Sequence, residues 1–351
     1  MGSVKDLEAI KKPTKSNMGV GRFHFSDRYS VFDWGEMPDL IERKGEALCM
    51  MGAYCFEKLH KKNVRTHYQG IVNKEGKAVN LDELKEPSRI MEVNLVNVYK
   101  PKPVAHEGKL CYDYRVYGRK PRNCLIPLEI IYRNGLPEGS SVFKRLEQGS
   151  TKFSDLGLDH YPKAGEHFRK PIFDVSTKLE EKDRYMTWEE AKGLAGLTYT
   201  EVVEIQELLL KVDKLISELA SRAGLVNEDG KIELAFDPER RLMLVDVVGT
   251  LDECRFTYDG LHVSKEIARQ FYRKTKWHSD LEDAKKLAEK EGVEDWKRLC
   301  ASQPPRIEPK LGKLISQMYL ATANALTAKK IFDTPDLADV VKQYKEYVVN
   351  H

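Results

Sequence analysis

The sequence predicts an α+β fold in which strands come first and helices follow. The first half contains short apolar runs separated by Gly, Pro and charged turns, as expected for the strands of an antiparallel sheet. The second half contains Ser/Thr-x-x-Glu sequences next to apolar stripes at helical spacing, which are typical of capped amphipathic helices. Strands followed by helices favour an α+β architecture over an alternating α/β one.

Strands dominate the prediction for the first half. Gly21–Ser26 alternates apolar and polar residues, which indicates a half-buried strand. A core-facing helix is expected over Ala47–Lys61, where apolar residues recur at helical spacing. Three further strand-like runs are Ile90–Lys100, Leu110–Tyr117 and Leu125–Tyr132.

Helices and one hairpin are predicted for the second half. Capping boxes that begin at Thr187, Thr198 and Ser279 predict three helix starts. One long helix is expected over Thr200–Arg222, followed by Gly224 as its C-terminal stop. The hairpin pairs Lys231–Phe236 with Arg241–Val248, and Pro335 is expected at the first position of a final helix.

Composition narrows the class of protein. The chain has 351 residues, 41% of them hydrophobic, and can bury a sizeable core. It shows neither a spanning apolar run nor a signal-peptide pattern, so we expect a cytoplasmic protein that does not bind a membrane. A net charge of +3 without a basic stripe argues against a nucleic-acid partner. The six scattered cysteines are expected to be buried thiols, with disulfides as the alternative.

The late hairpin is the most informative candidate site. If its turn is Asp237–Arg240, Lys231 faces Asp246, and Glu233 becomes a diagonal neighbour of Asp246 on the same face. Two carboxylates at that spacing suit Mg²⁺, which prefers oxygen ligands. The alternative is a solvated face of charged residues. A turn one residue longer would place the two carboxylates on opposite faces.

Other segments also gather polar side chains, although each could be an ordinary loop. Arg133 ends a strand and precedes a Gly/Ser turn, a combination that suits phosphate oxygens. Lys178 suits a carboxylate or phosphate, and Asp183 suits an amine. Asp252 and Arg255 follow an apolar strand, where they could meet a ligand, and Asp27–Asp33 forms a polar strand end.

Taken in order, these segments resemble the SAICAR synthetase family. Asp27–Asp33 matches the family's D-R-x-S-x-F-D, and Lys44-Gly45 follows as its Lys-Gly. Four later segments also resemble family motifs. Pro127–Arg145 resembles P-x-E-x-x-x-R followed by G-S-x-x-K-R, and Ser176–Asp183 resembles S-T-K…D. Asp229–Glu233 resembles D-x-K-x-E, and Asp246–Phe256 resembles D-E-x-x-T-P-D-S-S-R-F.

The resemblance implies a fold and a division of the chain. It implies a SAICAR synthetase-like α+β fold with an antiparallel-sheet N-terminal lobe, a larger mixed α+β ATP-grasp-like lobe and C-terminal helices. We expect a nucleotide-binding lobe over residues 1–122, a central ATP- and substrate-binding lobe over 123–275, and a helical region over 276–351 packed on the central lobe. A homo-oligomer is also expected from the family.

The implied activity is ATP-dependent ligation of CAIR to L-aspartate, giving SAICAR, ADP and phosphate in purine biosynthesis through an acyl phosphate. Mg²⁺ would be held by Glu233 and Asp246. The other residues implied for the nucleotide site are Lys5, Asn123, Leu125, Ile126, Glu129 and Lys231. Those implied for the substrates are Asp33, Arg133, Ser140, Ser141, Lys178, Asp183, Asp252 and Arg255. Catalytic roles would fall to Lys178, Asp183 and Lys231.

Three departures from the family pattern leave alternatives open. In Gly2–Leu7, Ser3 stands where the family's phosphate hairpin has a lysine. Val247 replaces an acid, and Glu253 replaces a serine. The alternatives are a related ATP-dependent ligase or kinase-like enzyme with another acid or amine, and a nucleotide-binding homologue with weakened catalysis.

Overall fold

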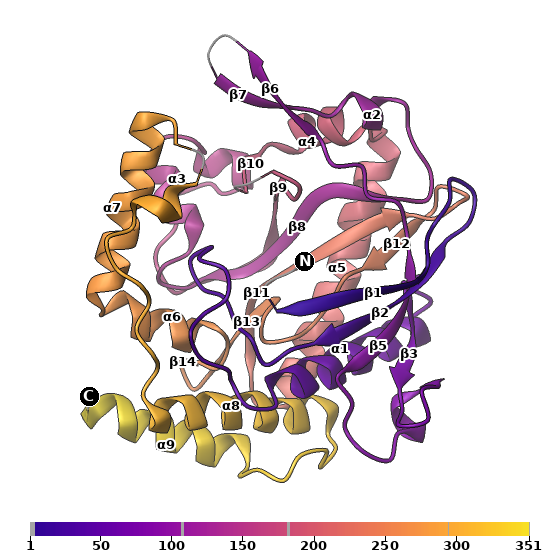
Figure 1. Cartoon of the computed structure of the whole chain (residues 1–351). Helices are drawn as coiled ribbons and strands as arrows, with labels where there is room; N and C mark the ends of the chain where they lie inside the picture. The colour runs from indigo at the N-terminus through magenta and orange to yellow at the C-terminus, as the bar shows by residue number, and fades with distance from the viewer. Residues whose placement is uncertain (1–3, 107–108, 181–182, 294, 351) are drawn as a thin grey trace.

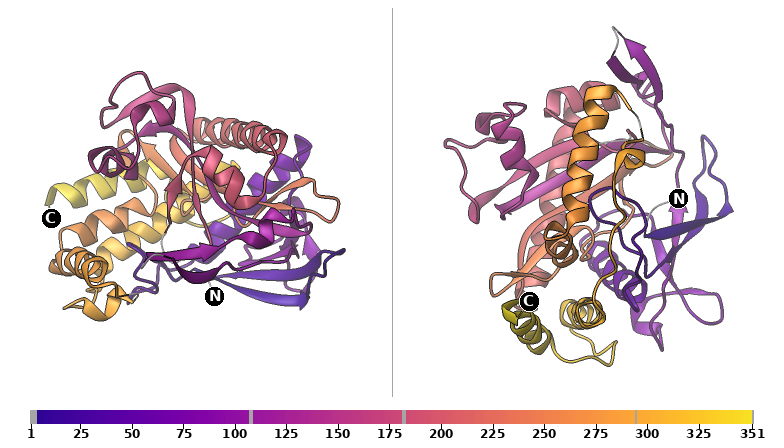
Figure 2. Two further views of the ribbon diagram at one scale, coloured as in Figure 1. Left: turned by 90° about the horizontal axis from the view of Figure 1, so that it is seen from above. Right: turned by 60° about the vertical axis from the view of Figure 1, so that its left-hand side comes forward.

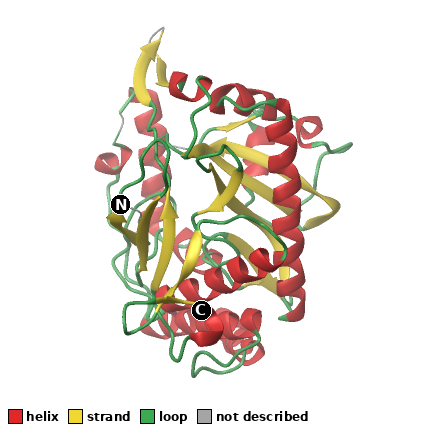
Figure 3. Cartoon of the chain, turned by 90° about the vertical axis from the view of Figure 1, so that its right-hand side faces the viewer, coloured by secondary structure: helices red, strands yellow, loops and turns green. Residues whose placement is uncertain are grey.

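A computed structural model gives the fold, and it describes residues 4–106, 109–180, 183–293 and 295–350. Gly2 and Ser3 of the predicted phosphate hairpin lie outside these residues. Antiparallel sheets and surrounding helices confirm the predicted α+β class (Figure 3).

The first sheet is built from the N-terminal part of the chain. Its strand order is β1-β2-β5-β3-β4, and all pairs are antiparallel. Helix α1 packs on this sheet and begins three residues before the predicted start. The strand expected over Ile90–Lys100 ends at Leu95. The elements are β1 Lys5–Lys11, β2 Gly19–Phe25, α1 Lys44–Lys61, β3 Tyr68–Val72, β4 Ala78–Val79, the short helix η1 Leu81–Glu83 and β5 Ile90–Leu95.

A small hairpin and a short helix connect the two main sheets. The hairpin projects at the top of Figure 1 and pairs β6 Lys102–His106 with β7 Lys109–Asp113. The strand predicted over Leu110–Tyr117 therefore ends early, because Arg115–Gly118 forms helix α2. The carboxylate of Asp113 accepts from the backbone N–H of Arg115 at the start of that helix.

The second sheet has the order β10-β9-β8-β11-β13-β14, and β12 pairs with the second half of β11. Helix α5 packs on β8 and β11, so one face of this sheet is covered (Figure 3). The elements are β8 Cys124–Leu136, α3 Ser141–Glu147, η2 Phe153–Leu156, β9 Glu166–Thr177, β10 Tyr185–Met186, α4 Trp188–Ala195, α5 Tyr199–Arg222, β11 Val226–Phe236, β12 Leu242–Val245, β13 Cys254–Tyr258 and β14 Leu261–His262.

The C-terminal helices follow this sheet, and α8 and α9 lie side by side (Figures 1 and 2). Helix α8 also packs against α1 and α5. Buried apolar side chains from all three predicted segments join in one continuous core. The elements are α6 Glu266–Arg273, α7 Lys276–Glu291, η3 Trp296–Leu299, α8 Pro309–Thr327 and α9 Leu337–Asn350.

Two of the three predicted capping boxes are confirmed. Thr187 caps α4 and Thr198 caps α5, and each accepts from the backbone N–H three residues later. The prediction for Ser279 is wrong, because Thr275 caps α7 one turn earlier and Ser279 lies inside the helix. The prediction for Pro335 is also wrong, because α9 begins at Leu337.

Two further predictions concern the cysteines and membranes. Cys49, Cys55, Cys124 and Cys254 are buried free thiols, as expected, whereas Cys111 is exposed and Cys300 is half-buried. Among the described residues, no helix is long and apolar enough to cross a membrane.

Candidate nucleotide and substrate site

The hairpin that carries the candidate metal ligands has a different register from the predicted one. Glu233 pairs with Val245 and Phe236 with Leu242, so the turn is one residue longer than assumed. The carboxylate of Asp237 explains the extra residue, because it accepts from the backbone N–H groups of Glu239 and Arg241. In this register a continuing strand would carry Asp246 to the face opposite Glu233.

Asp246 nevertheless lies near Glu233, because the strand ends at Val245. The backbone of Asp246 adopts the left-handed conformation, with φ at 63°. This conformation is uncommon for residues other than glycine. It breaks the alternation of the strand and sends the chain out of the ladder. The carboxylates therefore converge as predicted, but through a backbone turn and not through strand pairing.

Three lysines, two in strands and one just after a strand, neutralise a group of buried and half-buried carboxylates. Lys5 of β1 lies 2.7 Å from Asp246, and Lys178, just after β9, lies 2.5 Å from Glu233. Lys231 of β11 lies 2.8 Å from Glu129. Glu129 and Glu233 stand directly opposite each other on neighbouring strands.

This cluster occupies the face of the second sheet opposite α5. Ile130, Ile232 and Leu234 alternate with the charged residues and belong to the main core beneath α5. Because strand side chains alternate between faces, Glu129, Lys231 and Glu233 point away from that core.

Burial and charge shift the pKa values within the cluster. Burial and the nearby Asp246 raise the pKa of Glu233 to about 7, although Lys178 and Lys231 act in the opposite direction. Burial alone would raise the pKa of Asp246, but Lys5 and Lys178 outweigh it and hold that pKa below its usual value. Perturbed carboxylates of this kind are candidates for functional groups.

The donors present fit Mg²⁺. Glu233 is a buried carboxylate, Asp246 is a half-buried one, and Asp246 is close enough to shift the pKa of Glu233. Mg²⁺ is commonly bound through one or two carboxylates and retains several waters. Among the described residues no group of three or more His, Cys, Asp or Glu side chains could hold a metal. The two carboxylates, Glu233 and Asp246, would suit a hydrated magnesium ion bound together with phosphate.

A small apolar cluster lies beside the charged residues. Leu125 and Ala235 pair across β8 and β11, and Met243 and Val245 of β12 complete the cluster. Met18, Val96 and Leu179 pack against it. Its position on the same sheet face as Glu233 gives an apolar surface suited to an aromatic base next to a charged phosphate region.

Three of the residues predicted for the nucleotide site, Asn123, Leu125 and Ile126, stand at the start of β8 or just before it. Leu125 belongs to the small apolar cluster, whereas the side chain of Ile126 lies in the main core. The amide of Asn123 donates to the backbone carbonyls of Thr14 and Asn17 and ties the β1–β2 loop to the start of β8.

A cavity of about 640 Å³ adjoins the cluster and contains most predicted substrate residues. Asp33, Arg133, Ser141, Asp183, Asp252 and Arg255 all line it. Ser140 does not line it, because Ser140 is the buried N-cap of α3, with a side chain that accepts from Val142. Lys178 lies in the charged cluster. Of the two serines implied for the substrate site, only Ser141 lines the cavity.

Buried acids hold the two predicted phosphate-binding arginines. Arg133 donates to Asp174 at 2.9 Å and to Asp229 at 3.1 Å, and Arg255 donates to the other oxygen of Asp229 at 2.8 Å. Burial alone would raise the pKa of Asp229, but Arg255 and Arg133 lower it. Arg145 also pairs with Asp174. The guanidinium groups are therefore fixed before any ligand contacts them.

Asp252 and Asp183 differ strongly in environment. The carboxylate of Asp252 accepts from Lys44 and Tyr319, both at 2.7 Å. Burial opposes ionisation, but Lys44 and Lys265 lower the pKa of Asp252 to about 2. Asp183 instead faces the cavity, where burial by the surrounding walls and the carboxylates of Glu129 and Asp33 raise its pKa to about 6.

Sequence reasoning missed several cavity residues. Lys265, Arg269 and Arg273 of the α6 region line the cavity, as do Lys285 of α7 and Glu253. Arg269 and Arg273 share the carboxylate of Glu266. Lys265, Arg269 and Arg273 are basic residues spaced four apart, and this helical spacing was the signal in the sequence that could have identified them.

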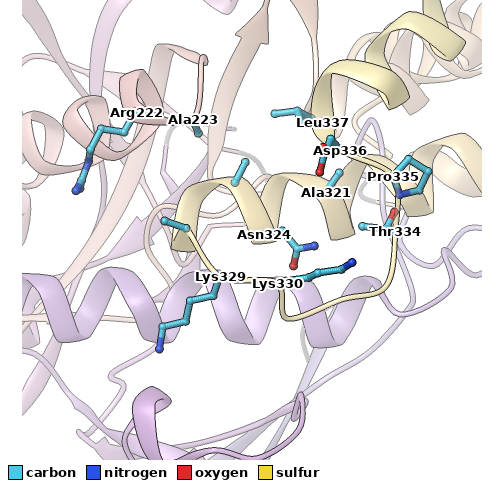
Figure 4. Close-up of a pocket in the computed structure, with 12 residues that line it drawn as sticks. Arg222, Ala223, Ala321, Asn324, Lys329, Lys330, Thr334, Pro335, Asp336 and Leu337 are labelled. Carbon is cyan, nitrogen blue, oxygen red and sulfur yellow. The ribbon is translucent and has the colours of Figure 1, made fainter.

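A second cavity, of about 440 Å³, lies between the end of α5, the end of α8 and the segment leading to α9. Figure 4 shows Asn324 on α8, with Lys330, Thr334 and Asp336 on the segment that follows it. It shares no lining residue with the first cavity, and none of the predicted site residues lines it.

Comparison with known proteins agrees with this geometry. The SAICAR synthetase family model matches residues 2–290. A protein of Archaeoglobus fulgidus, provisionally named phosphoribosylaminoimidazole-succinocarboxamide synthase, is 49% identical over 99% of both chains. A phosphoribosylaminoimidazole-succinocarboxamide synthase of Thermoplasma acidophilum is 32% identical, covering 88% of this chain and 93% of its own.

Solved structures share the fold at lower identity. A SAICAR synthase from Saccharomyces cerevisiae, complexed with SAICAR, superposes with a TM-score of 0.64 at 21% identity over 94% of each chain. A SAICAR synthetase in complex with ADP gives a TM-score of 0.55 at 18% identity, covering 88% of this chain and 99% of its own.

Proposed function

The chain belongs to the SAICAR synthetase family, and we propose how its residues carry out the ATP-dependent ligation of CAIR to L-aspartate. The observation that carries the proposal is the cluster of Lys5, Lys178 and Lys231 around Glu129, Glu233 and Asp246. It combines cations for phosphate oxygens with carboxylates for a divalent cation, next to an apolar patch for a base.

ATP would bind next to the charged cluster, where Lys5 of β1 meets the second sheet. The apolar cluster around Leu125 and Met243 takes the adenine, and Lys5 and Lys231 turn from their carboxylate partners to the phosphates. Glu233 and Asp246 would hold Mg²⁺, which would neutralise charge on the phosphates and orient them. The three lysines already lie at the site, so each ammonium would only exchange a carboxylate oxygen for a nearby phosphate oxygen.

The ribotide would bind in the adjoining cavity of about 640 Å³. Arg133 and Arg255 are held by buried acids and offer their remaining N–H donors to the ribotide phosphate. Ser141 lies on the same wall at the start of α3. The carboxylate of CAIR would then face Lys178 and Lys231, where the γ-phosphoryl group arrives.

The protein's contribution to the reaction is positioning and neutralisation. A carboxylate oxygen of CAIR attacks the γ-phosphorus of ATP, the bond to the ADP oxygen breaks, and an acyl phosphate forms. The amine of aspartate then attacks the acyl carbon, loses a proton and expels phosphate. Lys178 neutralises the developing charge, and Asp183 holds the amine at the cavity wall.

A coupled ADP-release assay tests this function. With ATP, Mg²⁺, CAIR and aspartate present, ADP should form at the rate at which SAICAR forms. Omission of CAIR or aspartate should each abolish sustained turnover. Replacement of aspartate by glutamate or asparagine tests the amine specificity. Release of ADP without formation of SAICAR would contradict the proposed substrates, and so would turnover with another acid in place of CAIR.

A further inference from the structure

A buried three-residue network joins the C-terminal helices to the substrate cavity. Tyr319 of α8 donates to one oxygen of Asp252, and Lys44 at the start of α1 donates to the other, both at 2.7 Å. Lys44 also donates to the carbonyl of Arg28 at 3.3 Å, and its ammonium lies 5.5 Å from the centroid of the Tyr319 ring. All three side chains are almost completely buried.

Asp252 belongs to the irregular turn between β12 and β13. The turn is stabilised internally where Glu253 and Cys254 donate their backbone N–H groups to the carbonyl of Thr250. Both flanking residues reach other parts of the site. The carboxylate of Glu253 lies 3.3 Å from Lys231, and Arg255 donates to Asp229 at 2.8 Å. The anchor at Asp252 therefore sets where this wall of the cavity lies.

Tyr319 is distant in sequence from every other residue of the site. It lies beyond residues 2–290, the part that the family model matches. Helix α8 packs against both α1 and α5, which fixes the ring of Tyr319 independently of its hydroxyl. Removal of the hydroxyl should therefore remove the hydrogen bond to Asp252 and leave the ring in place.

We propose that Tyr319 is a positioning residue for the ribotide site: by holding Asp252 against Lys44, it fixes the turn that carries Glu253 and Arg255. This inference rests on the proposed function, because it assigns the cavity to the ribotide. It gives the C-terminal helical region a specific part in the reaction. Without the hydroxyl, one oxygen of a buried carboxylate loses its donor, and the turn becomes less fixed.

The test compares Tyr319→Phe with a matched control, Tyr347→Phe. The hydroxyl of Tyr347 also donates at 2.7 Å to a carboxylate, that of Glu308, but neither residue lines the cavity. Both variants remove a hydroxyl in the C-terminal region and keep the ring. Tyr319→Phe should raise the KM for CAIR about tenfold, the size of a lost hydrogen bond to a charged group, with kcat within about twofold. Tyr347→Phe should leave both constants unchanged.

A second measurement separates failure of this inference from failure of the proposed function. Hydrogen exchange measured by mass spectrometry reports on the turn Thr250–Arg255 without any substrate. Tyr319→Phe should accelerate exchange in this turn, whereas Tyr347→Phe should not. Unchanged exchange and unchanged KM in Tyr319→Phe, or equal effects in both variants, would overturn the inference. Faster exchange in a protein that does not ligate CAIR would instead refute the function alone.

Discussion

The buried pair Lys44–Asp252 permits a quantitative prediction. Lys44→Met keeps the length of the side chain but leaves the carboxylate of Asp252 with Tyr319 as its remaining hydrogen-bond donor among the described residues. The side chains of the pair are 0% and 4% exposed, so water cannot replace the ammonium. Breaking such a pair costs about 3–5 kcal/mol of the free energy of unfolding, because an uncompensated charge stays buried.

The pKa of Asp252 supports a similar magnitude. It lies near 2 in the folded protein, against an ordinary value of 3.8. A depression of about two units corresponds to about 2–3 kcal/mol of stability. Because the folded-state pKa is the lower one, this stability is fully present above about pH 4 and is lost as the pH falls towards 2. The Lys44→Met variant should lack most of this pH dependence.

Urea unfolding followed by circular dichroism measures the effect. Lys62→Met serves as the control, because Lys62 pairs with Glu218 at the surface, where both side chains are about half exposed. That exposed pair should be worth less than about 1 kcal/mol. In the double variant Lys44→Met with Asp252→Leu neither charge of the pair remains, so its loss should be at least about 2 kcal/mol smaller than the sum of the single losses. If the stability losses of the two single variants sum to the loss of the double variant within about 0.5 kcal/mol, the argument is refuted. The pair would then contribute packing and not charge compensation.

Three further outcomes test the catalytic assignments. Glu233→Gln should weaken Mg²⁺-dependent ADP binding, measured by calorimetry, by more than about tenfold. Glu239→Gln changes an exposed carboxylate in the same hairpin turn and is the control. If the two variants bind ADP with equal affinity, Glu233 is not a metal ligand. The KM for aspartate should rise as the pH falls below about 6, because the carboxylate of Asp183 becomes protonated there. If Asp183→Asn shows the same pH profile as the wild type, this assignment is wrong. His67→Leu removes the ring N–H that donates to the backbone carbonyl of Asp246 at 2.9 Å. Because this bond helps to fix Asp246, its loss should raise the Mg²⁺ concentration for half-maximal ADP binding about fivefold, which is equivalent to about 1 kcal/mol. His67→Gln keeps a donor and should restore the wild-type value; the same rise in both His67 variants would point to lost packing.

Regular elements were predictable from the sequence because their signals are local. The strand β2 and the helix α5 follow from apolar spacing, and Thr187 and Thr198 satisfy the first N–H groups of their own helices. The Ser279 sequence has the same pattern but lies inside α7. The pattern alone does not decide between a cap and a charged helix face, because a cap also requires an extended backbone, which Thr275 has.

The candidate site was predictable in its residues more than in its geometry. Glu233 and Asp246 were expected together, but the register that was meant to bring them together is wrong by one residue. Turn length depends on how the carboxylate of Asp237 bonds the backbone, and the left-handed turn at Asp246 depends on distant contacts such as His67. Neither is visible in a local pattern. The pairing of Arg133 with Asp174 likewise depends on the alignment of β8 with β9.

These features meet in the segment Asp246–Arg255, which leaves the ladder after β12 and returns to β11 as β13. Within ten residues it carries the carboxylate proposed for the metal, the buried anchor at Asp252 and the arginine proposed for phosphate. An irregular backbone has few hydrogen bonds of its own, so its conformation must be imposed from outside. Here the constraints come from His67 and Lys44 of the N-terminal part of the chain and from Tyr319 of the C-terminal helices. The reaction site is therefore specified by the packing of all three regions on one short segment, and substitutions far from the substrates, such as Tyr319→Phe, should alter substrate binding.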